Sequence, residues 1–195
     1  MRIILASASA RRKNILTQLG VNFDVIPSDR EIKMEGTPSE VVEELSSIKA
    51  EDVASRVTED DVLIIAADTV VTDGRKIFGK PQDTTEAKFM LQSLQNHTHQ
   101  VRTGVTMILR RGANRETITF TETTDVTVRP MTDEEIDWYV STGESMDKAG
   151  AYAIQGKFGP FIRSIAGDYY NVVGFPIGSI YHKLKRVGVD LLINK

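Results

Sequence analysis

The 195-residue chain contains no cysteine. This absence excludes a disulfide scaffold, a zinc–cysteine site and a thiol nucleophile. No stretch of the sequence approaches the roughly 18 consecutive apolar residues of a membrane-spanning helix. The chain also lacks the glycine-rich loops of P-loop enzymes and of Rossmann dinucleotide-binding domains, which disfavours both kinds of nucleotide site.

The chain also has no net positive charge. The 24 lysines and arginines face 27 aspartates and glutamates, for a net charge of -3. We therefore expect no nucleic acid polymer as a partner. The lack of a long apolar run leads us to expect no membrane as a partner either. The apolar opening of residues 1–6 is too short for a secretory signal, so we expect a cytoplasmic protein. The length fits a single domain over residues 1–195.

Apolar periodicity predicts a mixed α/β fold. Threonine followed by glutamate three residues later, at Thr37 and Thr132, predicts two capped helix starts. Strands are expected at residues 2–6, 61–72, 76–81, 101–109 and 116–128. Helices are expected up to Gly20, at 38–56, at 84–94, after Thr132 and at 177–187.

The segment Ser7–Lys13 joins the first strand to the first helix and carries hydroxyls, small residues and three cations. Cations oppose the dipole of a helix N-terminus, whereas a bound anion would be held by free N–H groups and arginines. This pattern predicts a phosphate site. The alternative is a surface helix with an ordinary capping serine.

Asp68 interrupts an otherwise apolar strand. A carboxylate in such a place needs a cation, a metal or backbone donors. Lys49, which lies on or beside the packing face of its helix, and Lys80, which follows a predicted hairpin, are the candidate partners. The alternative is a purely structural ion pair.

Residues 146–156 combine small residues and two glycines with Asp147, Lys148 and Gln155. Glycine permits close approach of the backbone to a ligand, and a glutamine amide could read the edge of a nucleobase. We take these three polar residues as candidate substrate-binding residues. The alternative is a bulged strand with a solvent-facing Asp147–Lys148 pair.

Together these segments resemble the Maf family of nucleoside triphosphate pyrophosphatases almost from end to end. Composition and periodicity do not show this; five ordered motifs do. They are Leu5–Arg12, Ala67–Thr69, Gly79–Pro81, Met146–Gly156 and Gly167–Pro176.

The resemblance implies a Maf-like α/β fold, similar to that of inosine triphosphatases, with an elongated mixed sheet, flanking helices and a cleft between two lobes. It implies hydrolysis between the α and β phosphates with Mg²⁺ or Mn²⁺. Asp68 matches the family's catalytic aspartate, described as the proton acceptor. Ser7, Arg12, Lys49 and Lys80 match its polar and cationic cleft residues. We expect Lys49 and Lys80 to be catalytic together with Asp68, and Ser7 and Arg12 to bind substrate. A homodimer is also expected from the resemblance.

The family divides by nucleobase preference. The branch that acts on dTTP and UTP carries arginine, threonine and glutamine at three positions, matched here by Arg11, Thr69 and Gln155. The resemblance therefore implies a dTTP/UTP pyrophosphatase that cleanses nucleotide pools, modified pyrimidine triphosphates included, with a link to septum formation and division arrest.

Two residues depart from the family pattern. Ala10 replaces a proline of the first turn, and Ile32 stands where a glutamate of the metal shell is usual. Glu31, one residue earlier, is the expected replacement, so the expected metal ligands are Asp68 and Glu31.

Two other functions stay open. A nucleotide-binding regulator of division that has lost catalysis would explain Ile32. A hydrolase of another phosphorylated nucleotide metabolite, such as a nucleotide sugar, would use the same cations.

Overall fold

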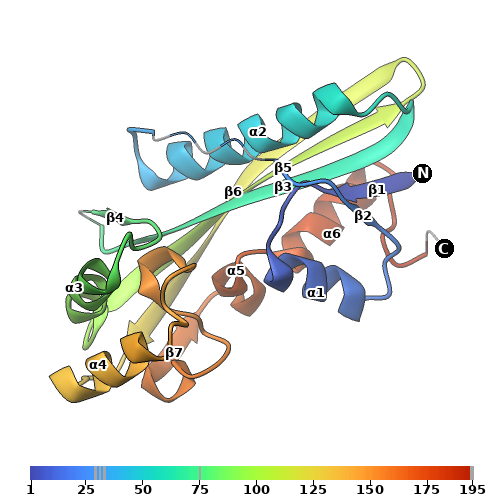
Figure 1. The fold of residues 1–195 in the computed structure, drawn as a ribbon. Coiled ribbons are helices and arrows are strands. Elements are labelled where there is room, and N and C mark those ends of the chain that lie inside the picture. The colour runs from blue at the N-terminus through green and yellow to red at the C-terminus, as the bar shows by residue number, and fades with distance from the viewer. Residues whose placement is uncertain (29, 31, 33, 75, 194–195) are drawn as a thin grey trace. The chain divides into compact units, whose positions relative to one another are not determined.

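A computed structural model describes residues 1–28, 30, 32, 34–74 and 76–193; Asp29 and the predicted metal ligand Glu31 lie outside the described residues. The chain is a mixture of strands and helices, as predicted (Figure 1). The strands are β1 (Arg2–Leu5), β2 (Asp24–Val25), β3 (Asp61–Thr72), β4 (Ile77–Phe78), β5 (Thr98–Arg111), β6 (Asn114–Val128) and β7 (Ile162–Ala166). The helices are α1 (Ala10–Gln18), α2 (Pro38–Arg56), α3 (Thr84–Leu94), α4 (Asp133–Ser141), α5 (Tyr169–Val173) and α6 (Ile177–Arg186), with 3-10 turns η1 (Ala149–Ala151) and η2 (Gly159–Phe161).

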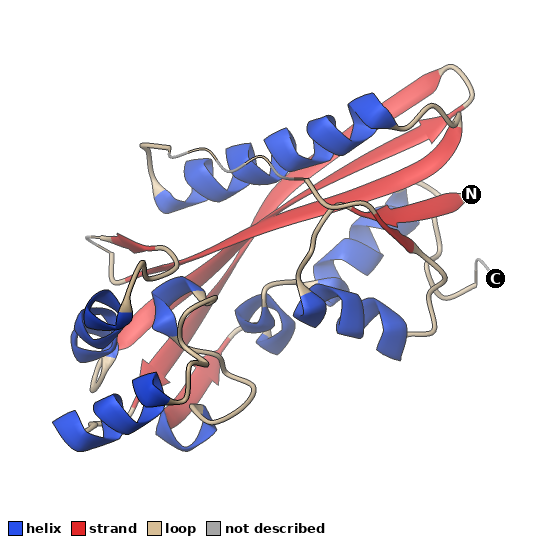
Figure 2. Cartoon of the chain, viewed as in Figure 1, coloured by secondary structure: helices blue, strands red, loops and turns tan. Residues whose placement is uncertain are grey.

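The strands form one seven-stranded mixed sheet in the order β2-β1-β3-β5-β6-β7, with β4 paired to β3 (Figure 2). β1 runs parallel to both β2 and β3, with Ile4 opposite Ile64. β4 is antiparallel to β3, and β7 is antiparallel to β6. These findings confirm the mixed α/β class. No helix within the described residues has the length and apolar character needed to cross a bilayer.

Two compact units divide the chain. Unit 1 contains Met1–Asp68, Thr103–Glu122 and the chain from Gly174 on. Unit 2 contains Thr69–Arg102 and Thr123–Val173. The boundaries fall inside β3, β5 and β6, so each of these strands contributes to both units. The assignment of residues 1–195 to one domain stays a prediction.

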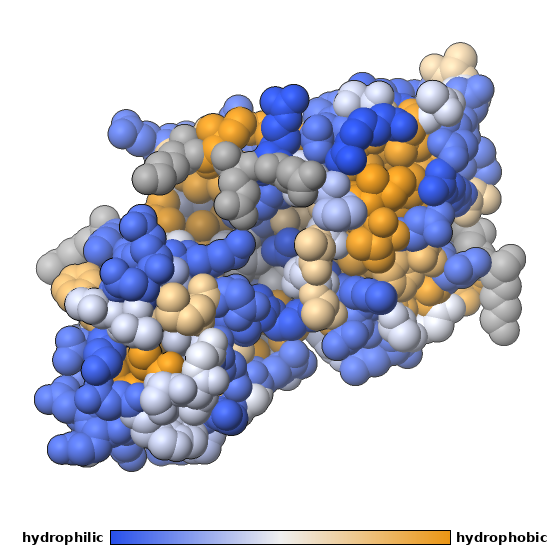
Figure 3. Space-filling model, in the orientation of Figure 1, coloured by the Kyte–Doolittle hydropathy of each residue, from blue (hydrophilic) through white to orange (hydrophobic). Residues whose placement is uncertain are grey.

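Unit 1 has helices on both faces of its part of the sheet, with α2 on one side and α1 and α6 on the other (Figure 1). Alternate residues of β1 and β3, among them Ile4 and Ile64, pack with Ala50 and Val53 of α2 in one buried cluster. Because side chains alternate across a strand, Asp68 shares the α2 face with Ile64. Hydrophobic surface lies over the β1 and β2 edge, where Val25 is 41% exposed (Figure 3).

Unit 2 has a separate core. Its buried cluster joins α3, α4 and the β-strand segments of this unit, with Tyr139, Tyr152 and Phe158 at its aromatic centre. The ring centroids of Tyr152 and Phe158 are 4.8 Å apart, and those of Tyr139 and Phe158 are 5.0 Å apart. This aromatic packing holds the segment that follows α4, which carries several predicted site residues.

Capping sets the helix ends as the sequence predicts. Thr37 and Glu40 form a reciprocal capping box at the start of α2, and Thr132 and Glu135 form another at α4. Gly20, with φ of 69°, follows the end of α1. Such boxes satisfy backbone N–H groups that a helix start leaves without partners.

The tip of the β5–β6 hairpin caps two helices of unit 1. Arg110 donates to the carbonyl oxygens of Val57 at 2.7 Å and Ala54 at 2.7 Å, at the end of α2. Its neighbour Arg111 donates to Val187 and Gly188 at 3.0 and 3.1 Å, at the end of α6. Consecutive strand residues point to opposite faces, so adjacent arginines reach the helices on opposite sides of the sheet.

Candidate active site

Asp68 forms an ion pair with Lys49 in unit 1. The Lys49 Nζ donates to Asp68 Oδ1, and the two side chains are 18% and 16% exposed, respectively. The α2 helix thus supplies the cation that the isolated carboxylate of β3 requires. This confirms one of the two partners expected for Asp68. The other candidate, Lys80, belongs to unit 2.

A glycine sets how closely α2 approaches the sheet. A Cβ added at Gly104 of β5 would lie 2.2 Å from the carbonyl oxygen of Val42. Nearby, the buried Ser46 hydroxyl is 2.9 Å from that of Thr106, which is 3.1 Å from that of Thr119. Only glycine at position 104 allows the backbone of Val42 to come this close to β5. This close packing fixes the position of α2, the helix that carries Lys49.

The turn between β1 and α1 is built around Arg12. Its Nε donates to the carbonyl oxygen of Gly174 at 2.8 Å, and its Nη1 donates to Ser7 Oγ at 3.0 Å. Burial lowers the pKa of Arg12 to about 10, with Asp68 acting to raise it and Arg11 to lower it. The guanidinium therefore stays charged at neutral pH, with its orientation fixed from two sides.

The α1 N-terminus itself has no side-chain cap. Ser9 occupies the N-cap position, but its side chain makes no capping hydrogen bond. Instead the Ser9 N–H donates to Ser7 Oγ at 3.3 Å. The alternative of an ordinary capping serine is therefore wrong. The Ser7 hydroxyl accepts hydrogen bonds from both the Ser9 N–H and Arg12.

Unit 2 contains the other predicted site residues. Thr69 follows Asp68 in β3, and Lys80 is an exposed residue after β4. The Gly150 N–H donates to the Gly79 carbonyl oxygen at 3.0 Å. This hydrogen bond joins η1 to the backbone of the residue that precedes Lys80. Lys148 pairs with Asp147; their side chains are 13% and 73% exposed.

The segment 146–156 is not a strand but a series of turns around η1. The alternative of a bulged strand is therefore wrong, although the Asp147–Lys148 pair exists. Gly150, with φ of 67°, leaves room for Val71, whose side chain would lie 2.9 Å from an added Cβ. Packing within unit 2 explains this glycine. Gln155 lies exposed in the turn that follows.

Of the two predicted metal ligands, only Asp68 lies among the described residues. No group of three His, Asp or Glu side chains suited to a metal occurs in the part of the chain that the structure describes. Mg²⁺ is commonly held by one or two carboxylates together with substrate phosphates and water. Asp68 fits that mode, while the expectation for Glu31 falls on a residue that is not described.

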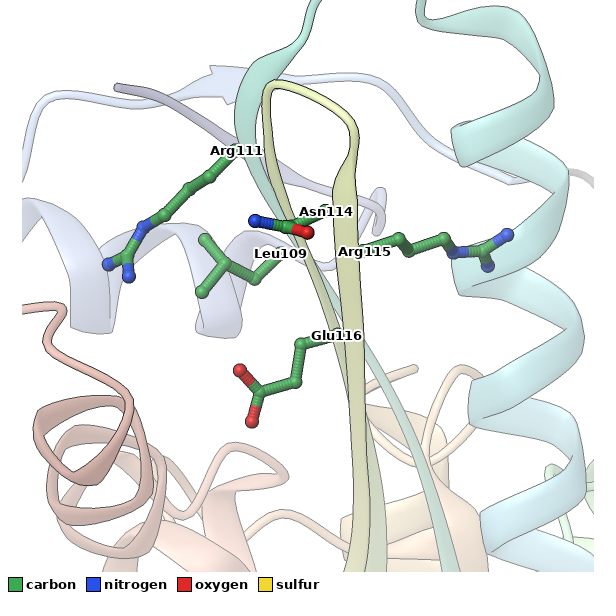
Figure 4. Close-up of a pocket in the computed structure, with 5 residues that line it drawn as sticks. All are labelled: Leu109, Arg111, Asn114, Arg115 and Glu116. Carbon is green, nitrogen blue, oxygen red and sulfur yellow. The ribbon is translucent and has the colours of Figure 1, made fainter.

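One hollow of unit 1 lies away from the predicted site residues. It has a volume of about 360 Å³ and lies at the β5–β6 hairpin, lined by Leu109, Arg111, Asn114, Arg115 and Glu116 (Figure 4). Arg111 and Arg115 point to opposite sides of the hairpin there (Figure 4). Arg115 pairs with Glu51 of α2. None of the predicted site residues lines this hollow. Both arginines make contacts that hold helices in place, Arg111 with the end of α6 and Arg115 with α2.

The sequence did not indicate two features of the structure. The Gly174 carbonyl oxygen that holds Arg12 is a backbone atom, which leaves no trace in residue type. The other is outside the site: in the core of unit 2, the Nε2 of buried His99 is 2.7 Å from the Tyr152 hydroxyl. Burial lowers the pKa of His99 to about 4, so the imidazole is neutral at pH 7.

Comparison with known proteins identifies relatives that match nearly the whole chain. A protein of Agathobacter rectalis named dTTP/UTP pyrophosphatase is 48% identical over 203 residues, covering 97% of this chain and 99% of that protein. A protein of Bacillus thuringiensis with the same name is 46% identical, covering 97% of each chain. The solved structure of the Staphylococcus aureus Ham1 protein is 19% identical, with a TM-score of 0.45 over 66% of this chain and 72% of that one. The family model for Maf-like proteins matches residues 2–187, and the chain belongs to the Maf family.

Proposed function

We propose that this protein is a nucleoside triphosphate pyrophosphatase that hydrolyses dTTP and UTP to the monophosphate and pyrophosphate. Relatives with that name match nearly the whole chain at 46–48% identity. The observation that carries the proposal is the Asp68–Lys49 pair in the same unit as the Ser7–Arg12 turn. A carboxylate among fixed cations suits water attack on a polyanionic phosphate.

The cations of unit 1 bind the triphosphate. A triphosphate carries about four negative charges, and Arg11, Arg12 and Lys49 offset much of that charge through charge-assisted hydrogen bonds. Arg12 is oriented before substrate arrives, because Gly174 and Ser7 hold two of its nitrogens. The uncapped N–H groups of α1 provide further donors for phosphate oxygens.

Asp68 acts on the attacking water. Lys49 contacts Oδ1 and fixes the carboxylate plane, so Oδ2 accepts a proton as the water oxygen forms a bond to the α phosphorus. The bond between the α phosphorus and the bridging oxygen then breaks, and pyrophosphate leaves with the bond electrons. A divalent cation held by Asp68 and the substrate would neutralise charge on the phosphate oxygens and acidify bound water.

The roles proposed for the residues of unit 2 come from the resemblance to the Maf family. Thr69 and Gln155, together with Arg11, are assigned to the choice of the base. The Gln155 amide offers one donor and one acceptor to the edge of uracil or thymine. Lys80, Asp147 and Lys148 contribute charge and hydrogen bonds to substrate binding. A homodimer and a cytoplasmic location remain predictions from the sequence.

The test is pyrophosphate release from dTTP, UTP, CTP, GTP, ATP and 7-methyl-GTP, with Mg²⁺, Mn²⁺ or EDTA. Metal-dependent release from dTTP and UTP in preference to purine nucleotides is expected. Asp68→Asn should lower the rate by about two to three orders of magnitude. A folded Asp68→Asn protein with a normal rate would refute the role of Asp68.

Two results would replace the proposal. Nucleotide binding without pyrophosphate release, unchanged in Asp68→Asn, would indicate a nucleotide-binding regulator. Faster turnover of a UDP-sugar than of UTP in a competition assay would indicate a hydrolase of another nucleotide metabolite.

A further inference from the structure

The turn that carries Gln155 is held at both ends. Gln155 is exposed, whereas Ala153 and Phe158 on either side are 7% and 1% exposed. An exposed amide can read a base selectively only if the backbone beneath it keeps one conformation, because each rotated amide presents a different order of donor and acceptor. The contacts that fix this backbone therefore bear on base selection.

Tyr139 holds the first end of the turn. This α4 residue is completely buried, and its hydroxyl accepts a hydrogen bond from the Ala153 N–H at 3.2 Å. The same hydroxyl donates to Glu144 Oε1 at 3.1 Å. Burial raises the pKa of Tyr139, so the hydroxyl keeps the proton that it donates to Glu144.

Glu144 holds the second end. Both of its carboxylate oxygens lie 3.2 Å from the Lys157 nitrogen, whose N–H donates to them. The intervening Gly156 has φ of 110°, and an added Cβ would lie 2.7 Å from Glu144 Oε2. The carboxylate thus occupies the space where any other residue would carry its side chain. Glycine is needed here both for the backbone angle and for the contact.

The backbone of Glu144 is itself anchored to α4. Its N–H donates to Thr142 Oγ1 at 3.3 Å, and the Thr142 hydroxyl donates to the Tyr139 carbonyl oxygen at 2.7 Å. The helix end, the carboxylate and the tyrosine hydroxyl are therefore one connected network. Such networks are stronger than their separate bonds and favour a single arrangement.

We propose that Tyr139 and Glu144 are positioning residues for nucleobase selection, which hold Ala153 and Lys157 on the two sides of Gln155. The inference rests on the proposed function, because it assigns these residues a part in choosing between pyrimidine and purine triphosphates. Neither residue contacts substrate; both act through the Gln155 turn.

The test compares kcat/KM for UTP with that for GTP in Tyr139→Phe, Glu144→Ala and Glu144→Gln. The UTP preference should fall about 5- to 30-fold in Tyr139→Phe and Glu144→Ala, the equivalent of one or two lost hydrogen bonds. The change should appear in KM for UTP, with kcat within about 2-fold, because the residues of unit 1 proposed to bind the phosphates are unchanged. Glu144→Gln keeps one acceptor oxygen and should retain more of the preference than Glu144→Ala.

A double-mutant cycle separates positioning from general stability. In a Gln155→Ala background, which has already lost the base-reading amide, Glu144→Ala should lower the preference by less than about 2-fold. Glu134→Ala, an exposed glutamate on the same helix as Tyr139, is the matched control and should keep the wild-type preference. Circular dichroism and thermal melting confirm that each variant is folded.

Three results decide the matter. An unchanged preference in folded Tyr139→Phe, or a full loss from Glu144→Ala in the Gln155→Ala background, would overturn the positioning role. If Glu144→Ala does not fold, Tyr139→Phe decides alone, since it keeps the shape of the original side chain. Absence of pyrophosphate release by the wild-type protein would instead overturn the proposed function.

Discussion

Replacing Gly104 with alanine should both destabilise the protein and slow hydrolysis. The added Cβ would lie 2.2 Å from the Val42 carbonyl oxygen, 2.3 Å from its carbonyl carbon and 2.7 Å from the Glu43 nitrogen. All three are backbone atoms of α2, so no side-chain rotation relieves the overlap. Gly104 does not have a left-handed φ, and backbone strain at the residue itself is therefore not the cause.

The size of the effect follows from the shift that the overlap demands. Contact distances of 3.0 Å or more require α2 to move away from β5 by roughly 1 Å, and overpacking of this kind typically costs about 1–3 kcal/mol. For a chain of this length that loss lowers the melting temperature by about 2–12 °C. Lys49 lies two helical turns beyond Val42, so it moves with the helix relative to Asp68. A misplacement of about 1 Å near the reaction can cost up to about 100-fold in rate.

The assay is thermal melting together with pyrophosphate release from UTP. Gly178→Ala is the matched control, because Gly178 lies within α6 of the same unit and an added Cβ meets nothing within 4 Å. The control should gain about 0.5–1 kcal/mol from helix propensity and keep its rate. A Gly104→Ala protein with the melting temperature and the rate of the control would refute the close approach of α2 to β5.

Three further predictions concern charge. Burial lowers the pKa of His99 from the ordinary imidazole value of about 6.5, which it has in the unfolded chain, to about 4 in the folded protein. The unfolded state therefore binds more protons between these two pH values, and stability falls as pH falls through this window. By pH 5 the loss is about 2 kcal/mol, and urea unfolding should show it in the wild type but not in His99→Gln. Arg110→Ala leaves two carbonyl oxygens at the end of α2 without their donor and should cost about 1–3 kcal/mol in urea unfolding, more than Arg115→Ala at an exposed pair. Arg12→Lys keeps the charge but cannot reach Ser7 and Gly174 together, so KM for UTP should rise at least about 10-fold; an unchanged KM would contradict the two-sided anchoring.

Much of the fold could be predicted because its signals are local. The capping boxes at Thr37 and Thr132 mark helix starts through residues only three positions apart. The Asp68–Lys49 pair was predictable for a different reason. A carboxylate in an apolar strand requires a partner, and a lysine on a packing face requires one as well. Asp68 and Lys49 are each unfavourable in an apolar environment without a partner of opposite charge, so each one suggests the other as its partner.

Other features could not be predicted because they depend on tertiary contacts. Nothing near Gly104 in the sequence indicates that Val42 packs against it, and nothing near Glu144 indicates that its carboxylate fills the space beside Gly156. The glycines of residues 146–156 did attract attention as places where a ligand comes close. Gly150 instead accommodates Val71, and Gly156 accommodates Glu144. A glycine in the sequence indicates that another group packs closely against the backbone there, but it does not show whether that group is a ligand or a side chain of the protein.

The hairpin tip has a consequence for protein engineering. The turn at Gly112 and Ala113 between β5 and β6 is exposed and small, as are the sites where tags and fused domains are usually tolerated. The arginines just before it, however, close the ends of α2 and α6, and the Gly112 N–H donates to the Asp60 carbonyl oxygen at 2.8 Å. A fluorescent probe or a fused domain inserted there would loosen the helix that carries Lys49 from its far end. The turn is thus a remote point from which the reactive ion pair can be disturbed without touching it.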